Sequence, residues 1–333
     1  MNAAPEKLQF LLDLQRSLGG CIPFDRWMHE ALYHPKFGYY TANIRGIGRR
    51  GDFVTWPALN DSLGRAIARW IRQNKPPGRL HIVEIGAGSG ELAASVIKAL
   101  GWLNRARYHI VEISPRLRQA QQERLGSRAI WHATVAEALM VSSGTAMVVS
   151  NELVDAFPCR VFQQDHKGWG ELALRLEEGR VIEEWISRPL PNASAFKHSW
   201  PLGQRVEVGE LFGDWRREWL PGWKSGHMLT IDYGDQCPAL YLRRPRGTLR
   251  AYGHHQRLEG RDVYAGFGLR DLTADVNFTD LQNEPALSAV SFGTLSAFLK
   301  EYDPTWLKEE AARVLSAPGG AGEAFKVLVQ KKR

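Results

Sequence analysis

The sequence predicts an α/β protein with a Rossmann-like, doubly wound, mostly parallel sheet, an N-terminal helical segment and an inserted β-rich subdomain. Two observations carry this prediction. From Leu80 onward, short apolar strands alternate with helical segments, which is the pattern of a parallel sheet with helices on both faces. After Pro158 the alternation gives way to strand pairs joined by tight turns, and a buried strand resumes at His227.

The elements follow in order along the chain. An N-terminal helix is expected over residues 6–18, and a second helix has a stripe of Leu63, Ile67, Trp70 and Ile71. The alternating region predicts strands at 81–85, 107–114, 128–132, 145–153 and 227–235, helices at 91–100, 115–125 and 292–302, and a last strand at 324–332. Turns at 165–170 and 177–180 predict antiparallel hairpins.

A chain of 333 residues accommodates one large domain with insertions or two ordinary domains. A break at "NKPPGR" ends the second helix, and we place a boundary there. We therefore expect an N-terminal cap over residues 1–75, a core over 76–157 and 225–333, and a covering subdomain over 158–224.

Composition narrows the class of protein. Apolar (44%) and charged (24%) contents are ordinary for a globular protein, and no apolar run approaches the ~18 residues of a membrane span. The N-terminus carries Glu6 and no long apolar stretch, so we expect no targeting signal. Cys21, Cys159 and Cys237 lie far apart, which argues against a zinc site or a disulfide framework. We expect a cytoplasmic protein without a metal.

The chain is basic, with a net charge of +7 and a pI of about 9.4. Arginines cluster in residues 45–51 and 242–250. A basic surface favours anionic partners, nucleic acid included, but we find no helix-turn-helix, zinc-finger or RNA-binding motif. Solvated basic loops are the simpler interpretation.

The stretch "HIVEIGAGSGEL" (81–92) reads as strand, tight loop and helix. Its glycines, Gly86, Gly88 and Gly90, have the spacing G-x-G-x-G, whereas a dinucleotide site has G-x-G-x-x-G. Glu84 stands just before the loop, where a carboxylate would oppose a pyrophosphate but would favour a cationic ligand. S-adenosylmethionine carries an ammonium and a sulfonium and no phosphate. We therefore predict an S-adenosylmethionine site, with a dinucleotide site or a ligand-free turn as the alternatives.

Glu112 ends the next strand, 22 residues after Gly90. Acids at this position accept hydrogen bonds from both ribose hydroxyls of an adenosine ligand. Glu112 therefore supports an adenosine ligand without deciding which kind.

The predicted strand at 145–153 leads into "NELVDAFP" (151–158). Ligands of open parallel sheets lie outside the carboxyl ends of the strands, so Asn151 and Glu152 should face the methyl donor. Asp155 lies on the same side if this turn is helical. Helix capping by Asn151 is the alternative interpretation. If the acceptor is a guanidinium, a carboxylate accepts two N–H groups and leaves the third nitrogen oriented toward the methyl group. Glu152 is the first candidate for that role and Asp155 the second.

Seven motifs follow one another along the chain: "GYYT" (38–41), "GDFVT" (51–55), "EIGAGSGEL" (84–92), "NELVDAFP" (151–158), "IDYG" (231–234), "GTLRAY" (247–252) and "DLTADVNF" (271–278). In this order they resemble the MidA-type S-adenosylmethionine-dependent methyltransferases, a family that includes a mitochondrial protein-arginine methyltransferase of respiratory complex I assembly. The likeness spans residues 22–330, and its most specific pieces are "GDFVT", "NELVDAFP" and "GTLRAY".

The resemblance implies a class I methyltransferase fold, S-adenosylmethionine as cofactor and a protein arginine substrate, with a complex I subunit as a candidate. It places the acceptor beside Asn151, Glu152 and Asp155, and it matches His255 to a family histidine. His255 alone reads more simply as a structural or surface residue. The donor site implied by the resemblance comprises Gly51, Asp52, Phe53, Glu84, Gly86, Gly88, Gly90 and Glu112.

Some positions depart from the family pattern. Ala58 stands where an acid is expected, and residues 131–134 lack the acid of the usual segment, so an adenine-side contact is lost or replaced. Asp275 replaces a histidine and Asn277 an aspartate. The donor loop is intact, so the departures bear mainly on the acceptor. A methyltransferase for nucleic acid or small molecules, and a non-catalytic assembly factor that binds S-adenosylmethionine, remain open.

Overall fold

The computed structural model describes residues 5–44, 61–101, 106–253, 256–308 and 320–333. The chain forms two compact units. The parallel-sheet unit comprises Arg45–Leu153, Trp215–Gly234 and Leu281–Arg333. The hairpin unit comprises Met1–Ile44, Val154–Asp214 and Asp235–Asp280.

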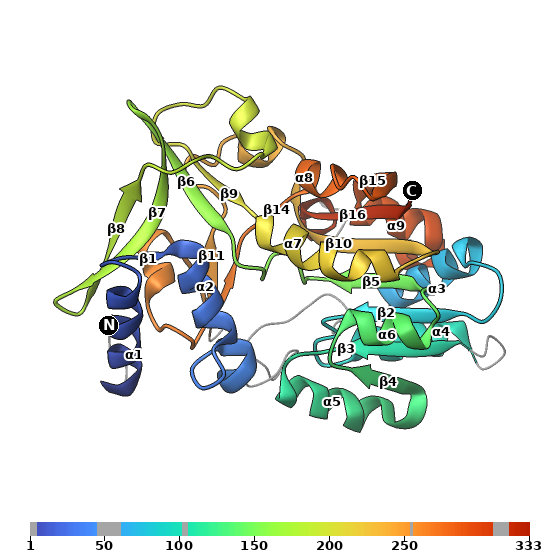
Figure 1. Ribbon diagram of the computed structural model, residues 1–333. Coiled ribbons are helices and arrows are strands. Elements are labelled where there is room, and N and C mark those ends of the chain that lie inside the picture. Colours follow the sequence, from blue (N-terminus) through green and yellow to red (C-terminus); the bar gives the residue numbers. More distant parts are fainter. Residues whose placement is uncertain (1–4, 45–60, 102–105, 254–255, 309–319) are drawn as a thin grey trace. The chain divides into compact units, whose positions relative to one another are not determined.

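The parallel-sheet unit is built on a sheet with the strand order β15-β16-β10-β5-β2-β3-β4 (Figure 1). Strands β4, β3, β2, β5 and β10 run parallel, and β16 and β15 continue the sheet antiparallel. The mostly parallel sheet predicted from the sequence is therefore present. The strands are β2 (His81–Ile85), β3 (Arg107–Val111), β4 (Ala129–His132), β5 (Met147–Asn151), β10 (His227–Asp235), β15 (Leu287–Thr294) and β16 (Phe325–Lys332).

Helices cover both faces of this sheet because neighbouring strand residues point to opposite sides. Ile82 packs into the core formed with α3, α4 and α9, whereas Val83 packs into the core formed with α6. This arrangement confirms the doubly wound architecture. The helices are α3 (Ser62–Asn74), α4 (Glu91–Leu100), α5 (Pro115–Leu125), α6 (Val135–Val141), α9 (Leu295–Tyr302) and α11 (Ala321–Ala324), and α7 (Glu210–Trp219) runs across the boundary between the units.

Helix α3 shows where the observed units differ from the expected boundaries. The stripe Leu63, Ile67, Trp70 and Ile71 is buried, as its helical spacing predicts. These side chains lie in the same core as α4 and the sheet. Residues 62–74 therefore belong to the parallel-sheet unit, not to a cap ending at residue 75, because their apolar face has its partners there.

The strand order reverses direction at β2. Strands β3 and β4 lie on one side of β2, and β5 and β10 lie on the other. At the carboxyl end of β2, Ile85 pairs with Val111 of β3 and with Ser150 of β5. Such a reversal is where open α/β sheets bind their ligands, beyond the carboxyl ends of the strands.

The hairpin unit contains the antiparallel region predicted over residues 158–224, with the order β1-β7-β6-β9 and β8 paired to β7. A smaller sheet has the order β12-β11-β13. The elements are α1 (Pro5–Ser17), β1 (Ile22–Pro23), α2 (Phe24–Tyr33), β6 (Arg160–Asp165), β7 (Gly168–Glu177), β8 (Arg180–Ile186), β9 (Arg205–Val208), β11 (Arg250–Gly253), β12 (Gln256–Glu259), β13 (Asp271–Thr273), β14 (Val276–Asn277) and α8 (Phe278–Gln282).

The N-terminal segment and residues 235–280 fold with this antiparallel region, although we expected them in a cap and in the core. Ile22 of β1 pairs with Leu174 of β7, and the Leu176 amide donates to Gln15 Oε1 at 2.6 Å. The backbone of β7 thus supplies the partners that the N-terminal segment needs. Within the described ranges, no helix has the length and apolarity of a membrane span.

Candidate functional site

The glycine loop connects β2 to α4 at the reversal point of the sheet. Gly86, Gly88 and Gly90 have φ values of +68°, +55° and +81°, a region that only glycine enters without strain. A Cβ on Gly86 would lie 2.9 Å from Leu153 Cδ1. The predicted strand, loop and helix are therefore present, and the backbone of the loop adopts its conformation because glycine occupies these three positions.

Glu84 lies inside the sheet, only 2% exposed. The Tyr108 hydroxyl donates to Glu84 Oε2 at 2.6 Å. Burial raises the pKa of Glu84 to about 7, with a further contribution from the negative charge of Glu112. A charge buried beside another charge of the same sign gains stability when a cation binds nearby.

Glu112 follows β3 and is also buried. Its Oε1 accepts the Ser114 amide at 2.9 Å, and its Oε2 accepts the Gln121 side-chain amide at 2.9 Å. Burial raises the pKa of Glu112 to about 7, and these hydrogen bonds, with one from the Ile113 amide, oppose the shift. Within the described residues, neither Glu84 nor Glu112 forms an ion pair, so both acids are held by neutral donors.

Residues 131–134, at the end of β4, are the segment without the expected acid, and they have other contacts in this chain. Trp131 Nε1 donates to Gln121 Oε1 at 3.0 Å, and Thr134 caps α6 by accepting the Glu137 amide at 3.2 Å. His132 Nε2 lies 2.9 Å from Nδ1 of the buried His109. These residues stabilise the sheet and the start of α6.

Asn151 and Glu152 lie at the carboxyl end of β5, the strand next to β2. Asn151 Nδ2 donates to Glu152 Oε1 at 3.1 Å, and the Glu152 amide donates to the carbonyl of Ile231 at 3.0 Å. No helix begins here, so the helix-capping interpretation of Asn151 is wrong. Glu152 has a φ of +51°, a left-handed conformation that is costly for a residue with a side chain and is found most often at functional sites.

Residues 152–158 form bends and turns and no helix, and Asp155 belongs to the hairpin unit. Asp155 is 7% exposed, and burial raises its pKa to about 6. The charge of Arg250 opposes the shift, and that of Asp275 adds to it. The Ala274 amide donates to the Asp155 carbonyl at 3.0 Å, which ties this segment to the "DLTADVNF" motif.

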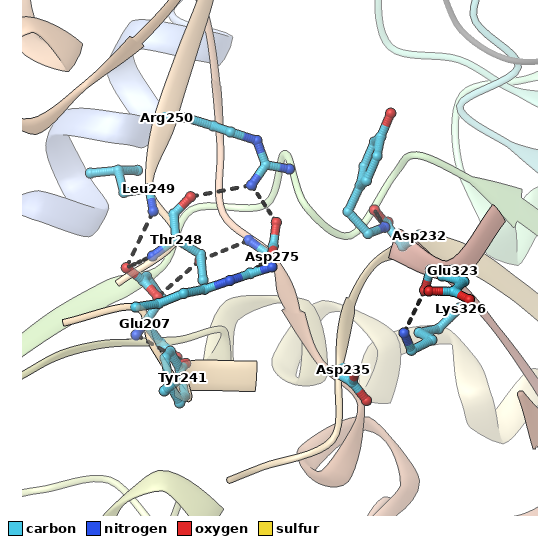
Figure 2. A network of polar contacts seen from close by, with 12 residues as sticks. Glu207, Asp232, Asp235, Tyr241, Thr248, Leu249, Arg250, Asp275, Glu323 and Lys326 are labelled. Carbon is cyan, nitrogen blue, oxygen red and sulfur yellow. Dashed lines mark hydrogen bonds and ion pairs between the residues drawn. The ribbon is translucent and has the colours of Figure 1, made fainter. Parts of the chain in front are cut away.

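The same unit contains a polar network that the sequence did not reveal (Figure 2). Glu207 accepts the amide and the hydroxyl of Thr248 at 2.9 and 3.0 Å. Arg250 donates to the Thr248 carbonyl at 3.2 Å and forms a buried ion pair with Asp275. Asp275, which departs from the family pattern, is therefore a partner of the arginine in "GTLRAY".

Gly247 opens the "GTLRAY" motif and makes this network sterically feasible. It has a φ of +74°, and a Cβ there would lie 2.1 Å from Glu207 Oε1. Another buried carboxylate of the unit, Asp271, accepts the Tyr40 hydroxyl at 2.9 Å. Burial raises the pKa of Asp271 to about 7, and the charge of Asp155 adds to the shift.

Several predicted residues cannot be placed. Gly51, Asp52, Phe53, Ala58 and His255 lie outside the described residues. Within the described part of the chain, no group of His, Cys, Asp and Glu side chains is arranged to hold a metal ion. Gln121 was missed by the sequence analysis, although it lies on the buried stripe of α5 between Leu117 and Leu125.

The reversal point, the left-handed glycine loop and the two buried acids define a class I methyltransferase that uses S-adenosylmethionine. The family model described as "Putative S-adenosyl-L-methionine-dependent methyltransferase" matches residues 62–292. The chain belongs to this family, and the predicted fold class and family are confirmed.

A crystal structure of a Burkholderia thailandensis superfamily member bound to S-adenosyl-homocysteine is 27% identical to this chain, with a TM-score of 0.83. The match covers all of this chain and 95% of that one. The cofactor prediction is confirmed by this likeness and by the family. The residues fit the cofactor, because three glycines let the loop backbone approach a ligand and, within the described residues, Glu84 and Glu112 have no ion-pair partner. When bound, S-adenosylmethionine supplies an electrophilic methyl group.

Curated relatives are also similar over most of the chain. The mitochondrial protein arginine methyltransferase NDUFAF7 homolog of Drosophila melanogaster is 28% identical over 78% of this chain, which spans 65% of that protein's length. The Danio rerio protein arginine methyltransferase NDUFAF7 is 26% identical over 84% of this chain and 73% of its own length.

Proposed function

We propose that the protein methylates arginine side chains of a protein substrate, and that a respiratory complex I subunit is its target in a host that has this complex. The relatives named as protein arginine methyltransferases support the reaction class. The observation that carries the proposal is Glu152, a left-handed acid at the carboxyl end of β5, beside the strand that leads into the glycine loop.

The chemistry of Glu152 suits a guanidinium. Both oxygens of an ionised carboxylate accept hydrogen bonds, so Glu152 is able to hold two N–H groups of an arginine in one plane. Asn151 donates to Oε1 and restricts the rotation of this carboxylate. Orientation of the acceptor nitrogen and exclusion of water are the main contributions such a site makes. Glu152 also stabilises the positive charge that arginine keeps at neutral pH.

The same proposal places the reaction in the cytoplasm. Cys21, Cys159 and Cys237 are free thiols, which supports a reducing compartment. The net charge of +7 leaves nucleic acid as the competing substrate class, and the experiment below separates the two.

Labelled methyl transfer into a lysate of the host tests the proposal. We expect label that protease removes and nuclease leaves, and mass spectrometry should locate it on arginine. Glu152→Gln should lower the transfer rate by about 100-fold or more, which is the effect of losing one charged contact used in the transition state. Donor affinity should be unchanged in this variant.

Glu178→Gln is the matched control, because Glu178 is also left-handed, with a φ of +48°, but lies in the exposed turn between β7 and β8. It should transfer methyl groups at the rate of the unmodified protein. Label released by nuclease would reject the protein substrate. A Glu152→Gln protein as active as the control would remove Glu152 from the mechanism.

A further inference from the structure

Gln121 is a fully buried polar residue between the glycine loop and Glu112. It lies on the inward face of α5, with no exposed surface, in line with Leu117 and Leu125. A buried carboxamide must find partners for its oxygen and for both amide hydrogens, or its burial is costly. All three positions are used here.

The orientation of this carboxamide is set by Trp131. An indole N–H is able only to donate, so the Gln121 atom 3.0 Å from Trp131 Nε1 is the oxygen. The amide nitrogen then faces the other way, and its two hydrogens reach the Gly88 carbonyl at 2.7 Å and Glu112 Oε2 at 2.9 Å. One side chain therefore joins the glycine loop to the acid of the next strand.

The hydrogen bond from Gln121 affects how many acceptor positions of the Glu112 carboxylate are available to a ligand. An ionised carboxylate has about four acceptor positions. The Ser114 amide occupies one on Oε1, Gln121 occupies one on Oε2, and the Ile113 amide also interacts with the carboxylate. The remaining acceptor capacity is available to a hydroxyl donor of a ribose.

Helix α5 also packs against the loop itself. A Cβ on Gly90 would lie 3.4 Å from Gln121 Cγ and 3.5 Å from Arg124 Cδ. Arg124 Nε donates to the Ser89 carbonyl at 2.8 Å. The loop is thus held by α5 at two carbonyls, those of Gly88 and Ser89, but only Gln121 also reaches Glu112.

We propose that Gln121 is a positioning residue for the methyl donor. By donating to both the Gly88 carbonyl and Glu112, it fixes the orientation of the carboxylate that binds the ribose hydroxyls. The inference rests on the proposed methyltransferase function for its ligand. It requires no knowledge of the methyl acceptor, because donor binding is measured without transfer.

The test is calorimetric titration of Gln121→Leu with S-adenosylhomocysteine, with 5′-methylthioadenosine and with the 2′-deoxy form of the latter. Loss of a hydrogen bond to a buried charge should weaken binding of both ribose ligands by about 10- to 100-fold. The affinity for the deoxy ligand should fall much less. The ratio of the affinities for the ribose and deoxyribose ligands should therefore fall toward one. Gln119→Leu, on the exposed side of the same helix, should keep both affinity and preference.

Trp131→Phe provides a second variant should Gln121→Leu fail to fold, because it removes the N–H that orients the amide and leaves Glu112 in place. It should reduce the ribose preference in the same direction. Equal losses for ribose and deoxyribose ligands would show that Gln121 merely supports the loop and would overturn the proposal. Unchanged affinity in either folded variant would also overturn it. A reduced ribose preference in a protein that fails to methylate arginine would reject the proposed function and leave this inference standing.

Discussion

Buried carboxylates of the two units are held in different ways. In the parallel-sheet unit, Glu84 and Glu112 accept hydrogen bonds from neutral donors, have no ion pair within the described residues, and have their pKa raised to about 7. In the hairpin unit, Asp275 is paired with the buried Arg250. A buried acid without a cation makes the unliganded protein less stable and favours a cationic ligand, whereas a paired acid stabilises the fold itself. The difference separates a binding site from a structural network.

Gly88→Val should have the largest effect and should abolish measurable donor binding. Its φ of +55° is strained for a β-branched residue, and the side chain would occupy the space of the ligand. Calorimetry with S-adenosylhomocysteine measures this. Gly101→Val is the matched control, since Gly101 has a φ of +70° and open space around it at the end of α4. Normal affinity in Gly88→Val, or equal losses in the two variants, would refute the loop assignment.

Arg250→Met tests whether the ion pair of Asp275 in the hairpin unit stabilises the fold. Removing the buried cation leaves Asp275 with only the half-exposed Arg244 as an ion-pair partner within the described residues, so the unfolding free energy should fall by up to the ~3–5 kcal/mol of a broken buried pair. Arg257→Met on the neighbouring strand breaks an exposed pair with Glu259 and should cost little. Chemical denaturation measures both. Similar stabilities for the two variants would mean that the Arg250 pair is not structural.

Glu112→Gln should stabilise the unliganded protein at alkaline pH. The folded pKa of about 7 lies above the ordinary value of 4.5, so Glu112 contributes stability below pH 4.5 and loses it as the pH rises through 7. The shift corresponds to about 3 kcal/mol at most. The melting temperature of Glu112→Gln should exceed that of the unmodified protein at pH 8 and approach it at pH 5. A variant that is less stable at pH 8 would contradict the account.

The features that could be predicted from the sequence are those formed by residues close together along the chain. Strand and helix alternation predicted β2 to β5, and the glycine loop with Glu84 was visible within a dozen residues. The hairpin-unit network was hidden because Glu207, Thr248 and Asp275 come from distant segments, and no local pattern joins them. For the same reason Asp275 looked like a departure from the family, although it is the partner of Arg250.

The boundaries of the two units could not be predicted from local sequence patterns either. Residues 5–44 and 235–280 contain ordinary helices and strands, and only their pairing partners place them with β6 to β9. Gln121 had a local signal, a polar residue on the apolar stripe of α5, but the pattern alone does not say which groups it contacts.

The measurement that tests the central claim most directly is calorimetric titration at pH 8 with S-adenosylhomocysteine and with NAD, in the unmodified protein and in Glu112→Gln. The account predicts saturable binding of S-adenosylhomocysteine, a loss of about 10-fold or more in the variant, and no binding of NAD. Binding of NAD without binding of S-adenosylhomocysteine would contradict it, because the loop and its two acids would then hold a pyrophosphate.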